Sequence, residues 1–415
     1  MGHAKLTFDD PAAGYPNFLK TAFETNHKTT PSDTPVLIEM KEPGAKAELE
    51  ALVSEKSDLE LIDNYAEQYA ELLLSKNAHL YRANYAVQVA SIKDLLDEHY
   101  AGRKSWELGS WVYFPWKKQL VHILAQHEFE ELRTIRNRDL ITKSEQKQLF
   151  DCHVVAFGMS VGSAGALAMA ITGTSRKIKL VDGAVISGSN LNRILTGVSS
   201  VGMSKALIIG RQIYEMNPYS TVAYYDKATK DNIGGILDDP WHVNLVIDEI
   251  DDIETKIRIR SEARARKIPV IMATELGDTV ILDVERFDLE PTRALLHNMI
   301  PNVEDLLSNP IENYREWTKH AVSIIDPKNM TIKMQKSLLK IGATIVTHPQ
   351  LGSTVMMTGG VLAFAAKNIA TGGKLNSGRY VVSLERELLA DHKTRHYRRK
   401  HRQHTKVLQK AVSSM

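Results

Sequence analysis

An alternation of apolar strands and amphipathic helices between His153 and Leu282 constrains the fold more than any other feature of the sequence. This pattern predicts an α/β fold in which helices flank a mainly parallel sheet. Ligands of such sheets bind at the carboxyl ends of the strands, so the residues after each strand are the first candidates for a site. The expected strands are 153–157, 178–182, 221–225, 244–248 and 269–273, and the expected helices between them are 162–172, 203–216 and 253–266.

The regions on either side of this segment have mostly helical patterns. We expect an N-terminal helical region with a short β-hairpin at 1–130, a nucleotide-binding domain at 131–385 and a basic C-terminal tail at 386–415. The elements behind this division are helical spacing at 45–76 and 84–100, two short strands within 110–124, a charged helical connector at 126–150, a mostly helical stretch at 290–342, an apolar helix at 353–370 and a strand at 379–384.

Composition excludes several classes of protein. The 52 basic and 50 acidic residues nearly balance, so overall charge favours no particular partner. Cys152 is the only cysteine, which rules out an internal disulfide and a cysteine-only zinc site. No apolar run approaches the roughly 18–20 residues of a membrane span, and the N-terminus has no signal pattern. We therefore expect a soluble cytoplasmic protein without zinc and without a membrane partner.

A nucleotide site is predicted where the first strand turns into the first helix. Gly158 and Gly162 would let backbone N–H groups approach phosphates at the helix N-terminus, and Ser160 stands where a middle glycine is expected. Asp182 ends the next strand, 20 residues after Gly162, at the place of a carboxylate that binds ribose hydroxyls. These residues alone fit NAD as well as ATP.

The charged residues that follow favour ATP. Asn190 and Arg193 lie in one short loop after Asp182, and Lys205 begins the next helix. The two cations would neutralise the charge that builds on pyrophosphate as it leaves. Asp251 follows a buried strand and can hold Mg²⁺, which prefers carboxylate oxygen and water. Each residue alone is more often part of a surface ion pair, but their joint placement at the strand ends of one sheet favours a site.

At these residues the chain resembles the E1-like (ThiF-type) adenylating superfamily, which includes ubiquitin-activating enzymes and the activators of molybdopterin and thiamine sulfur carriers. The resemblance lies in the series Asp…Ser-Asn-Leu-Asn-Arg…Gly-x-x-Lys…Asp-x-x-Asp and covers about residues 131–285, with weaker similarity to about 385. It implies a Rossmann-like E1-type adenylation fold that uses ATP and Mg²⁺.

The resemblance also implies roles for individual residues. Asp182 corresponds to the ribose ligand, Asp251 to the magnesium-linked aspartate, and Asn190, Arg193 and Lys205 to the triphosphate ligands. Arg138 corresponds to the arginine that the family sends across its dimer interface onto the γ-phosphate, which implies a homodimer.

The chain departs from the family pattern in four ways. Its glycine loop is one residue shorter, with Ser160 in place of a glycine, and Ala184 stands where many members have a second aspartate. The Cys-x-x-Cys zinc motif is absent, and so is a cysteine for a thioester, because Cys152 precedes the first strand and is expected to be buried there.

We therefore expect ATP-dependent adenylation of a carboxylate, followed by direct transfer of the acyl group to an external nucleophile. The carboxylate would belong to a peptide, a small protein or a small acid, and the N-terminal region is the expected place for its recognition. One alternative is an NAD(P)-dependent oxidoreductase, which would leave Arg193, Lys205 and Asp251 without a shared purpose. The other is a non-catalytic nucleotide-binding scaffold, which Ala184 and the altered loop favour.

The basic run at 392–404 is expected to be a solvated terminal helix rather than a nucleic-acid contact, so nucleic acid is not an expected partner. His392 and His396 have the i, i+4 spacing of a metal pair on a helix, but six nearby cations oppose a bound divalent ion. No metal is expected in this segment.

Overall fold

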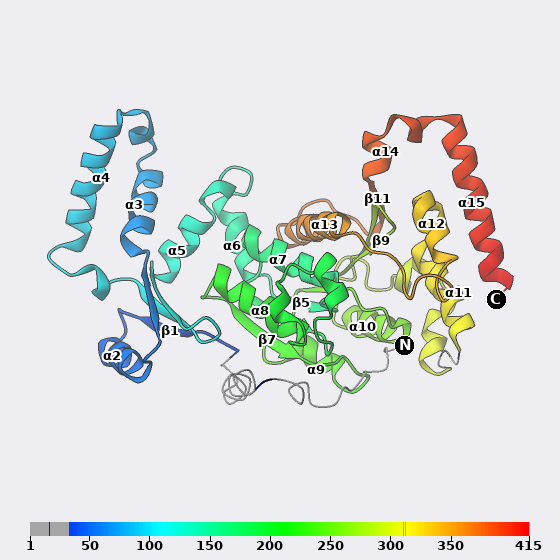
Figure 1. Ribbon diagram of the computed structural model, residues 1–415, viewed down its shortest axis with the longest axis horizontal. Helices are drawn as coiled ribbons and strands as arrows, with labels where there is room; N and C mark the ends of the chain where they lie inside the picture. Colours follow the sequence, from blue (N-terminus) through cyan, green and yellow to red (C-terminus); the bar gives the residue numbers. More distant parts are fainter. Residues whose placement is uncertain (1–15, 17–32, 310, 312, 415) are drawn as a thin grey trace.

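The computed structural model describes residues 16, 33–309, 311 and 313–414, and its centre is a seven-stranded sheet (Figure 1). The strand order is β11-β10-β9-β8-β5-β6-β7, and the five strands from β9 to β7 are parallel. The parallel sheet expected from the alternation is confirmed. The strands are β5 (Val154–Phe157), β6 (Lys177–Val181), β7 (Thr221–Tyr225), β8 (Leu245–Asp248), β9 (Val270–Glu275), β10 (Thr279–Glu285) and β11 (Gly378–Ser383).

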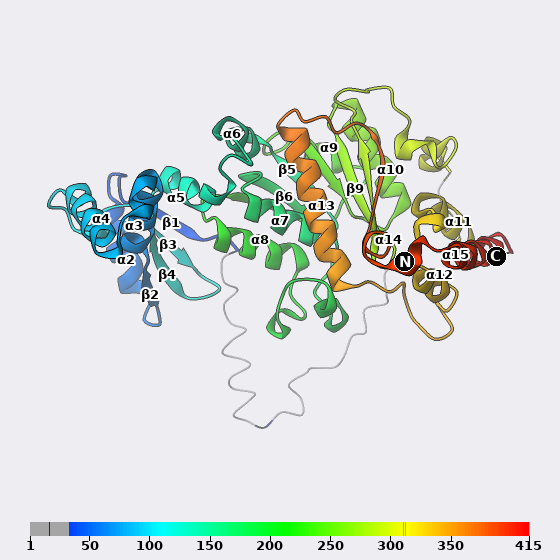
Figure 2. The same ribbon diagram turned by 90° about the horizontal axis from the view of Figure 1, so that it is seen from above.

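Helices cover both faces of this sheet, so its five inner strands are buried almost throughout, while the outer strands β7 and β11 are only partly buried. One face packs against α7 (Gly162–Thr172), α8 (Lys205–Met216) and α13 (Gly352–Ala370), and Figure 2 shows α13 lying across it. The other face packs against α9 (Ile233–Asp238) and α10 (Ile253–Ala265). The bounds of α7, α8, α10 and α13 lie within two residues of those expected from hydrophobic spacing.

The N-terminal region holds more β-structure than the expected hairpin. Its hairpin, β3 (Ser110–Phe114) and β4 (Gln119–Ile123), is joined by β1 (Val36–Glu39) and β2 (Glu60–Asp63) in the order β1-β3-β4-β2. The prediction of one helical stretch at 45–76 was wrong, because β2 divides it into α2 (Ala45–Glu55) and α3 (Tyr65–Lys76). The apolar residues at helical spacing include Ile62, which belongs to this edge strand. Helix α4 (Tyr85–Tyr100) lies beside α3, as expected.

This N-terminal unit is fastened to the amino-terminal edge of the central sheet. Glu130, in α5 (Gln126–Arg133), accepts two hydrogen bonds of 2.8 and 2.6 Å from Arg176, which immediately precedes β6. The Tyr219 hydroxyl, just before β7, donates to the Leu124 carbonyl at 2.6 Å. Trp116 Nε1 donates to Glu215, near the end of α8, at 2.6 Å. The unit therefore docks opposite the edge at which strand-end ligands bind.

The C-terminal extension packs at the far side of the sheet, at the other end of the molecule from α3 and α4 (Figure 1). It begins after β10, a strand that the sequence pattern did not distinguish from the helical stretch beyond it. Helix α15 (Arg395–Ser414) packs on α12 (Ile332–Leu338) and α11 (Tyr314–Ile325) through the buried Leu408 and Val412. No helix in the described ranges is long and apolar enough to span a membrane. The remaining α-helices in the described ranges are α6 (Lys143–Asp151) and α14 (Leu384–Leu388).

A buried ion network fixes the end of β8, from which the site loop departs. The Arg260 guanidinium, fully buried on α10, donates to the carboxylates of Asp248 and Glu285. Lys256 Nζ donates to the same Asp248 oxygen at 3.2 Å, and the other oxygen accepts the Ile250 N–H at 3.2 Å. The two cations hold the pKa of Asp248 below its ordinary value in spite of burial, which would raise it. The network thus keeps a charged aspartate under the loop 249–252.

Loss of one member should leave an uncompensated buried charge. Arg260→Ala is expected to lower the free energy of unfolding by about 3–5 kcal/mol, the usual cost of breaking a buried ion pair. Arg264→Ala, which breaks the partly exposed pair with Glu304 and a 3.3 Å hydrogen bond to the Arg293 carbonyl, should cost only about 1 kcal/mol. Urea unfolding of both variants measures the difference, and equal losses would contradict the structural role of the network.

Candidate nucleotide-binding site

The turn between β5 and α7 is built for close approach of a ligand to the backbone. Gly158 has a φ of +87°, and a Cβ atom there would lie 2.5 Å from the Glu249 carbonyl oxygen, so only glycine fits. The turn leads directly into the N-terminus of α7, where the first backbone N–H groups have no partner within the helix. These groups and the helix dipole favour a phosphate at this end.

Asp182 ties this turn to the loop that follows β6. Its Oδ2 accepts the Met159 N–H at 2.7 Å, and its Oδ1 accepts the Ala184 N–H at 2.7 Å. The carboxylate is half-buried, and each oxygen has lone-pair capacity left for a ribose hydroxyl. Asp182 therefore both shapes the site and remains available to a ligand.

Arg193 closes the site from the loop after β6. Its Nε donates to Ser160 Oγ at 3.2 Å, which brings the loop at 188–193 onto the β5–α7 turn. Ser160, the departure from the glycine pattern, thus has a specific role as the acceptor for Arg193. Asn190 is buried and accepts the Ser187 N–H at 3.0 Å, so in this structure its carbonyl oxygen shapes the loop.

The N-terminus of α13 braces the same loop from outside. Asn192 Nδ2 donates to the Gln350 carbonyl at 3.0 Å. A Cβ atom on Gly352 would lie 2.4 Å from the Asn192 carbonyl oxygen, which explains the glycine at the start of α13. The loop that carries Arg193 is therefore held on two sides.

Lys205 and Asp251 lie at the same edge of the sheet as Arg193. Lys205 begins α8, and its N–H donates to the Ala184 carbonyl at 3.0 Å, beside Asp182. Asp251 is exposed in the loop after β8 and is close enough to Arg193 to raise the pKa of that guanidinium, although burial is the larger influence and lowers it. The structure thus brings Asp182, Arg193, Lys205 and Asp251 together around the β5–α7 turn.

Two further carboxyl groups enter this site that the sequence analysis did not single out. Glu249 follows β8, and its Oε1 accepts the Ala273 N–H at 2.7 Å. Glu275 ends β9 and accepts from Gln350 Nε2 at 3.2 Å and from Thr358 Oγ1 at 3.3 Å. Burial raises the pKa of Glu249 well above its ordinary value and that of Glu275 to about 7. Their positions after strands, the same signal that pointed to Asp182, could have revealed them.

Arg138 lies apart from these residues. Its neighbour Asn137 donates from Nδ2 to the Thr172 carbonyl at 2.9 Å, at the C-terminal end of α7. That end is about 16 Å from the helix N-terminus, the length of eleven residues of α-helix. Arg138 itself pairs with Glu131 at 2.9 Å and is exposed. Within one chain, therefore, Arg138 is not part of the site.

Cys152 is buried before β5, as expected, and burial raises the pKa of its thiol to about 12. The described residues contain no group of three or more His, Cys, Asp or Glu side chains that could hold a metal ion. Asp251 is still a suitable ligand for Mg²⁺, which is commonly held by one or two carboxylates, water and substrate phosphates.

With this geometry established, comparison with known proteins assigns the chain to a family. The sequence matches the ThiF family over residues 133–402, well over half of its length, and the chain belongs to that family. The match extends beyond 385, the expected end of the nucleotide-binding domain, into α15. The resemblance inferred from the sequence motifs is confirmed.

Two curated relatives differ in how much of their length is matched. The chain is 32% identical over 306 residues to the uncharacterized protein MT1398 of Mycobacterium tuberculosis, a match that covers 73% of this chain and 42% of that protein. It is 28% identical over 212 residues to tRNA threonylcarbamoyladenosine dehydratase of Escherichia coli, a match that covers 50% of this chain and 72% of that enzyme. The chain thus spans less than half of the mycobacterial relative.

Solved structures with a similar arrangement share little sequence with this chain. PaaA has 17% identity and a TM-score of 0.43, with 63% of this chain and 68% of PaaA covered. The E. coli dehydratase TcdA in complex with AMP has 18% identity and a TM-score of 0.42, with 58% and 95% covered. E. coli MccB with ATP has 14% identity and a TM-score of 0.40, with 58% and 63% covered.

The raised pKa of Glu275 predicts a pH-dependent stability. An unfolded glutamate titrates near pH 4.3, so between about pH 4 and 7 the unfolded chain ionises while the native Glu275 stays protonated. The native state should therefore lose stability as pH rises over this range, and the loss should persist above pH 7. Glu275→Gln removes this cost. We expect the variant to match the native chain at pH 4 and to be more stable at pH 8, by at most about 4 kcal/mol. Urea unfolding at the two pH values measures the difference.

The single proton of the Thr358 hydroxyl has two acceptors within reach, Glu275 and the Thr354 carbonyl at 3.0 Å. In the variant it can go to the Thr354 carbonyl, which leaves the hydroxyl oxygen able to accept from the new amide. Glu67→Gln, a change at an exposed glutamate on α3, serves as the control and should leave the pH dependence as it is. A Glu275→Gln variant that is less stable than the native chain at pH 8 would contradict the assignment.

Proposed function

We propose that the chain activates a carboxylate with ATP, giving an acyl-adenylate and pyrophosphate, and then transfers the acyl group directly to an external nucleophile. The carboxylate oxygen attacks the α-phosphorus, and the bond from that phosphorus to the β-phosphate oxygen breaks. The nucleophile then attacks the acyl carbon and AMP leaves. The first step needs no general base, because the attacking carboxylate is already ionised.

The observation that carries this proposal is the hydrogen bond of Arg193 to Ser160. It fixes a guanidinium over the phosphate-binding turn at the N-terminus of α7, beside Asp251. A dinucleotide oxidoreductase would need the turn and Asp182 but would have no use for this cation. Charge stabilisation of leaving pyrophosphate requires a positioned donor of this kind.

The remaining residues take roles around the same nucleotide. Asp182 would accept hydrogen bonds from the ribose hydroxyls, and Lys205 would add a second charge near the phosphates. Asp251 would hold Mg²⁺, which supplies neutralisation of phosphate charge when it is bound. Positioning and electrostatics, rather than proton transfer, would provide most of the rate enhancement.

Direct transfer is supported by the state of the only cysteine. Cys152 is buried before β5, at the opposite edge of the sheet from Arg193, and its raised pKa keeps the thiol protonated. Only the thiolate is a competent nucleophile. An acyl-enzyme thioester would therefore have no suitable residue in this chain.

We also propose a homodimer in which Arg138 serves the site of the partner subunit. The support is its position at the C-terminal end of α7, which places it at a distance from its own site. The N-terminal unit docks at the same edge, so any role in recognising the carboxylate substrate would also be directed at the partner's site. That substrate would be a peptide or small-protein C-terminus, or a small acid.

ATP–pyrophosphate exchange across a panel of carboxylates and peptides tests the proposed reaction. One class of acid should support exchange, and Arg193→Ala should reduce its rate about 100-fold or more, as expected when one positioned donor is lost. Asp251→Ala should also reduce the exchange rate, most strongly at low Mg²⁺. Arg315→Ala and Asp231→Ala, which remove exposed charges of the same kinds, serve as matched controls and should leave the exchange rate within a factor of about two.

Binding assays distinguish the alternatives. Tight ATP binding without exchange on any acid would favour the nucleotide-binding scaffold. NADH binding without ATP binding would overturn the proposal in favour of an oxidoreductase.

Mixing two inactive variants tests the contribution of Arg138. Arg138→Ala and Arg193→Ala should each be inactive alone, while a mixed dimer would contain one intact site, built from Arg193 of one chain and Arg138 of the other. After equilibration, random mixing should restore about a quarter of native exchange activity, since half of the dimers are mixed and each has one good site. A mixture as inactive as its components would show that Arg138 does not act across an interface.

A further inference from the structure

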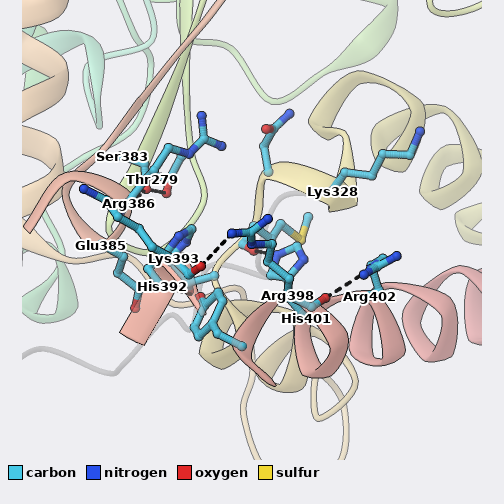
Figure 3. A pocket seen from close by; sticks show the side chains of 14 residues that line it. Thr279, Lys328, Ser383, Glu385, Arg386, His392, Lys393, Arg398, His401 and Arg402 are labelled. Atoms are coloured by element: carbon cyan, nitrogen blue, oxygen red, sulfur yellow. Dashed lines mark hydrogen bonds between the residues drawn. The ribbon is translucent and has the colours of Figure 1, made fainter. Parts of the chain in front are cut away.

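A cavity of about 470 Å³ lies beside the edge of the sheet formed by β10 and β11 (Figure 3). Its walls come from the facing ends of β10 and β11, from the 3₁₀ turn Pro327–Asn329, and from the segment that runs through α14 into α15. This volume is in the range of small-molecule binding sites. The sequence analysis interpreted the basic run at 392–404 as a solvated helix, but the structure folds part of it over this cavity.

The cavity has a large excess of positive charge. Five cations from four separate elements line it, against one carboxylate, that of Glu385, which accepts the Tyr397 hydroxyl at 3.0 Å. None of the five forms an ion pair with any residue in the described part of the chain, so the excess is four positive charges. The five cations are Lys328, Arg386, Lys393, Arg398 and Arg402.

Two of these cations, the exposed Arg398 and Arg402, are kept close to each other because one helix carries both. Helix α15 is anchored on its other side by the buried Thr405, Leu408 and Val412. Arg398 and Arg402 are four residues apart on the same helix, a spacing at which like charges repel. The sequence of α15 contains no acidic residue that could relieve this repulsion. Burial lowers the pKa of His392 on the cavity wall, and the charge of Arg386 lowers it further. A bound anion would offset these costs.

The donors around the cavity are suited to phosphate. Guanidinium groups bind phosphate oxygens through paired N–H donors, and Arg386, Arg398 and Arg402 supply three of them. The hydroxyl groups of Thr279 and Ser383, hydrogen-bonded to one another at 2.9 Å, lie on the cavity wall formed by the sheet. A ligand with a single carboxylate would balance only one of the four excess positive charges, whereas phosphate groups carry more charge each. We infer that the cavity binds the phosphate of a compact, multiply charged ligand.

This site is separate from the nucleotide-binding residues, although the two are close. Glu275 pairs with Val280, whose side chain faces α13, while the neighbouring Thr279 points to the opposite face, where α12 and α15 pack. The β9–β10 turn therefore stands between the two sites, with Thr331 against Gly277 on the cavity side. The inference does not depend on the adenylation chemistry.

Pyrophosphate binding to the full chain tests this inference. Isothermal titration should show saturable binding that persists in the Arg193→Ala variant and after the nucleotide site is filled with Mg²⁺ and a non-hydrolysable ATP analogue. The double substitution Arg398→Gln, Arg402→Gln should weaken it at least about tenfold, because one charge-assisted hydrogen bond is worth that much in affinity. Lys328→Gln, on the opposite wall and without a side-chain partner to lose, should weaken it several-fold.

Matched controls distinguish pyrophosphate binding in the cavity from non-specific attraction of pyrophosphate to a basic helix. Arg399→Gln with Lys400→Gln removes the same charge from exposed positions of α15 outside the cavity, and Lys333→Gln does so on α12. Both should leave the affinity within a factor of about two. Equal weakening by the Arg399/Lys400 pair, or no saturable binding below about 10 mM, would overturn the inference.

An oligothymidylate probe then identifies the source of the phosphate. Competition with pyrophosphate, lost in the Arg398/Arg402 variant, would assign the site to a nucleic-acid phosphate. Pyrophosphate binding without such competition would assign it to a small phosphorylated molecule.

Discussion

The candidate site depends on the carboxylate of Asp182, which accepts the Met159 N–H with one oxygen and the Ala184 N–H with the other. Both donors belong to loops at the carboxyl ends of parallel strands, one after β5 and one after β6. The carboxylate therefore sets the spacing between the phosphate-binding turn and the loop that carries Arg193. The Arg193–Ser160 hydrogen bond joins the same loop to the turn at a second point. Loss of Asp182 would remove the direct link between the turn and the loop, and would leave Arg193 held only by Ser160 and by the contacts of its loop with α13.

The two edges of the sheet carry different parts of the proposed mechanism. The carboxyl edge holds Asp182, Arg193, Lys205 and Asp251, while the amino edge holds Cys152, the segment around Arg138 and the docked N-terminal unit. An ATP molecule bound at the first edge could not reach the second within one subunit. Symmetric association would resolve this separation, since a partner can bring its own amino-edge groups to the site.

Hydrophobic periodicity predicted the parallel strands and the helices between them because each buries one continuous apolar surface, as in β5 and α7. It failed at β2, where Ile62 fits a helical spacing shared with residues of α2 and α3. The motif residues of the site were found because strand ends converge in this fold. Glu249 and Glu275 were missed because their importance comes from burial against Ala273, Gln350 and Thr358, which are distant in sequence. The basic cavity was missed for the same reason, since Lys328 and Arg398 meet only after folding.

The central claim is that a carboxylate oxygen becomes bonded to the α-phosphorus of ATP at this site. The most direct measurement uses a substrate acid labelled with ¹⁸O in its carboxylate, followed by mass spectrometry of the nucleotide and phosphate products. The account predicts AMP that carries one labelled oxygen per turnover, together with unlabelled pyrophosphate. Label in inorganic phosphate, accompanied by ADP, would mean attack at the γ-phosphate and would contradict the account.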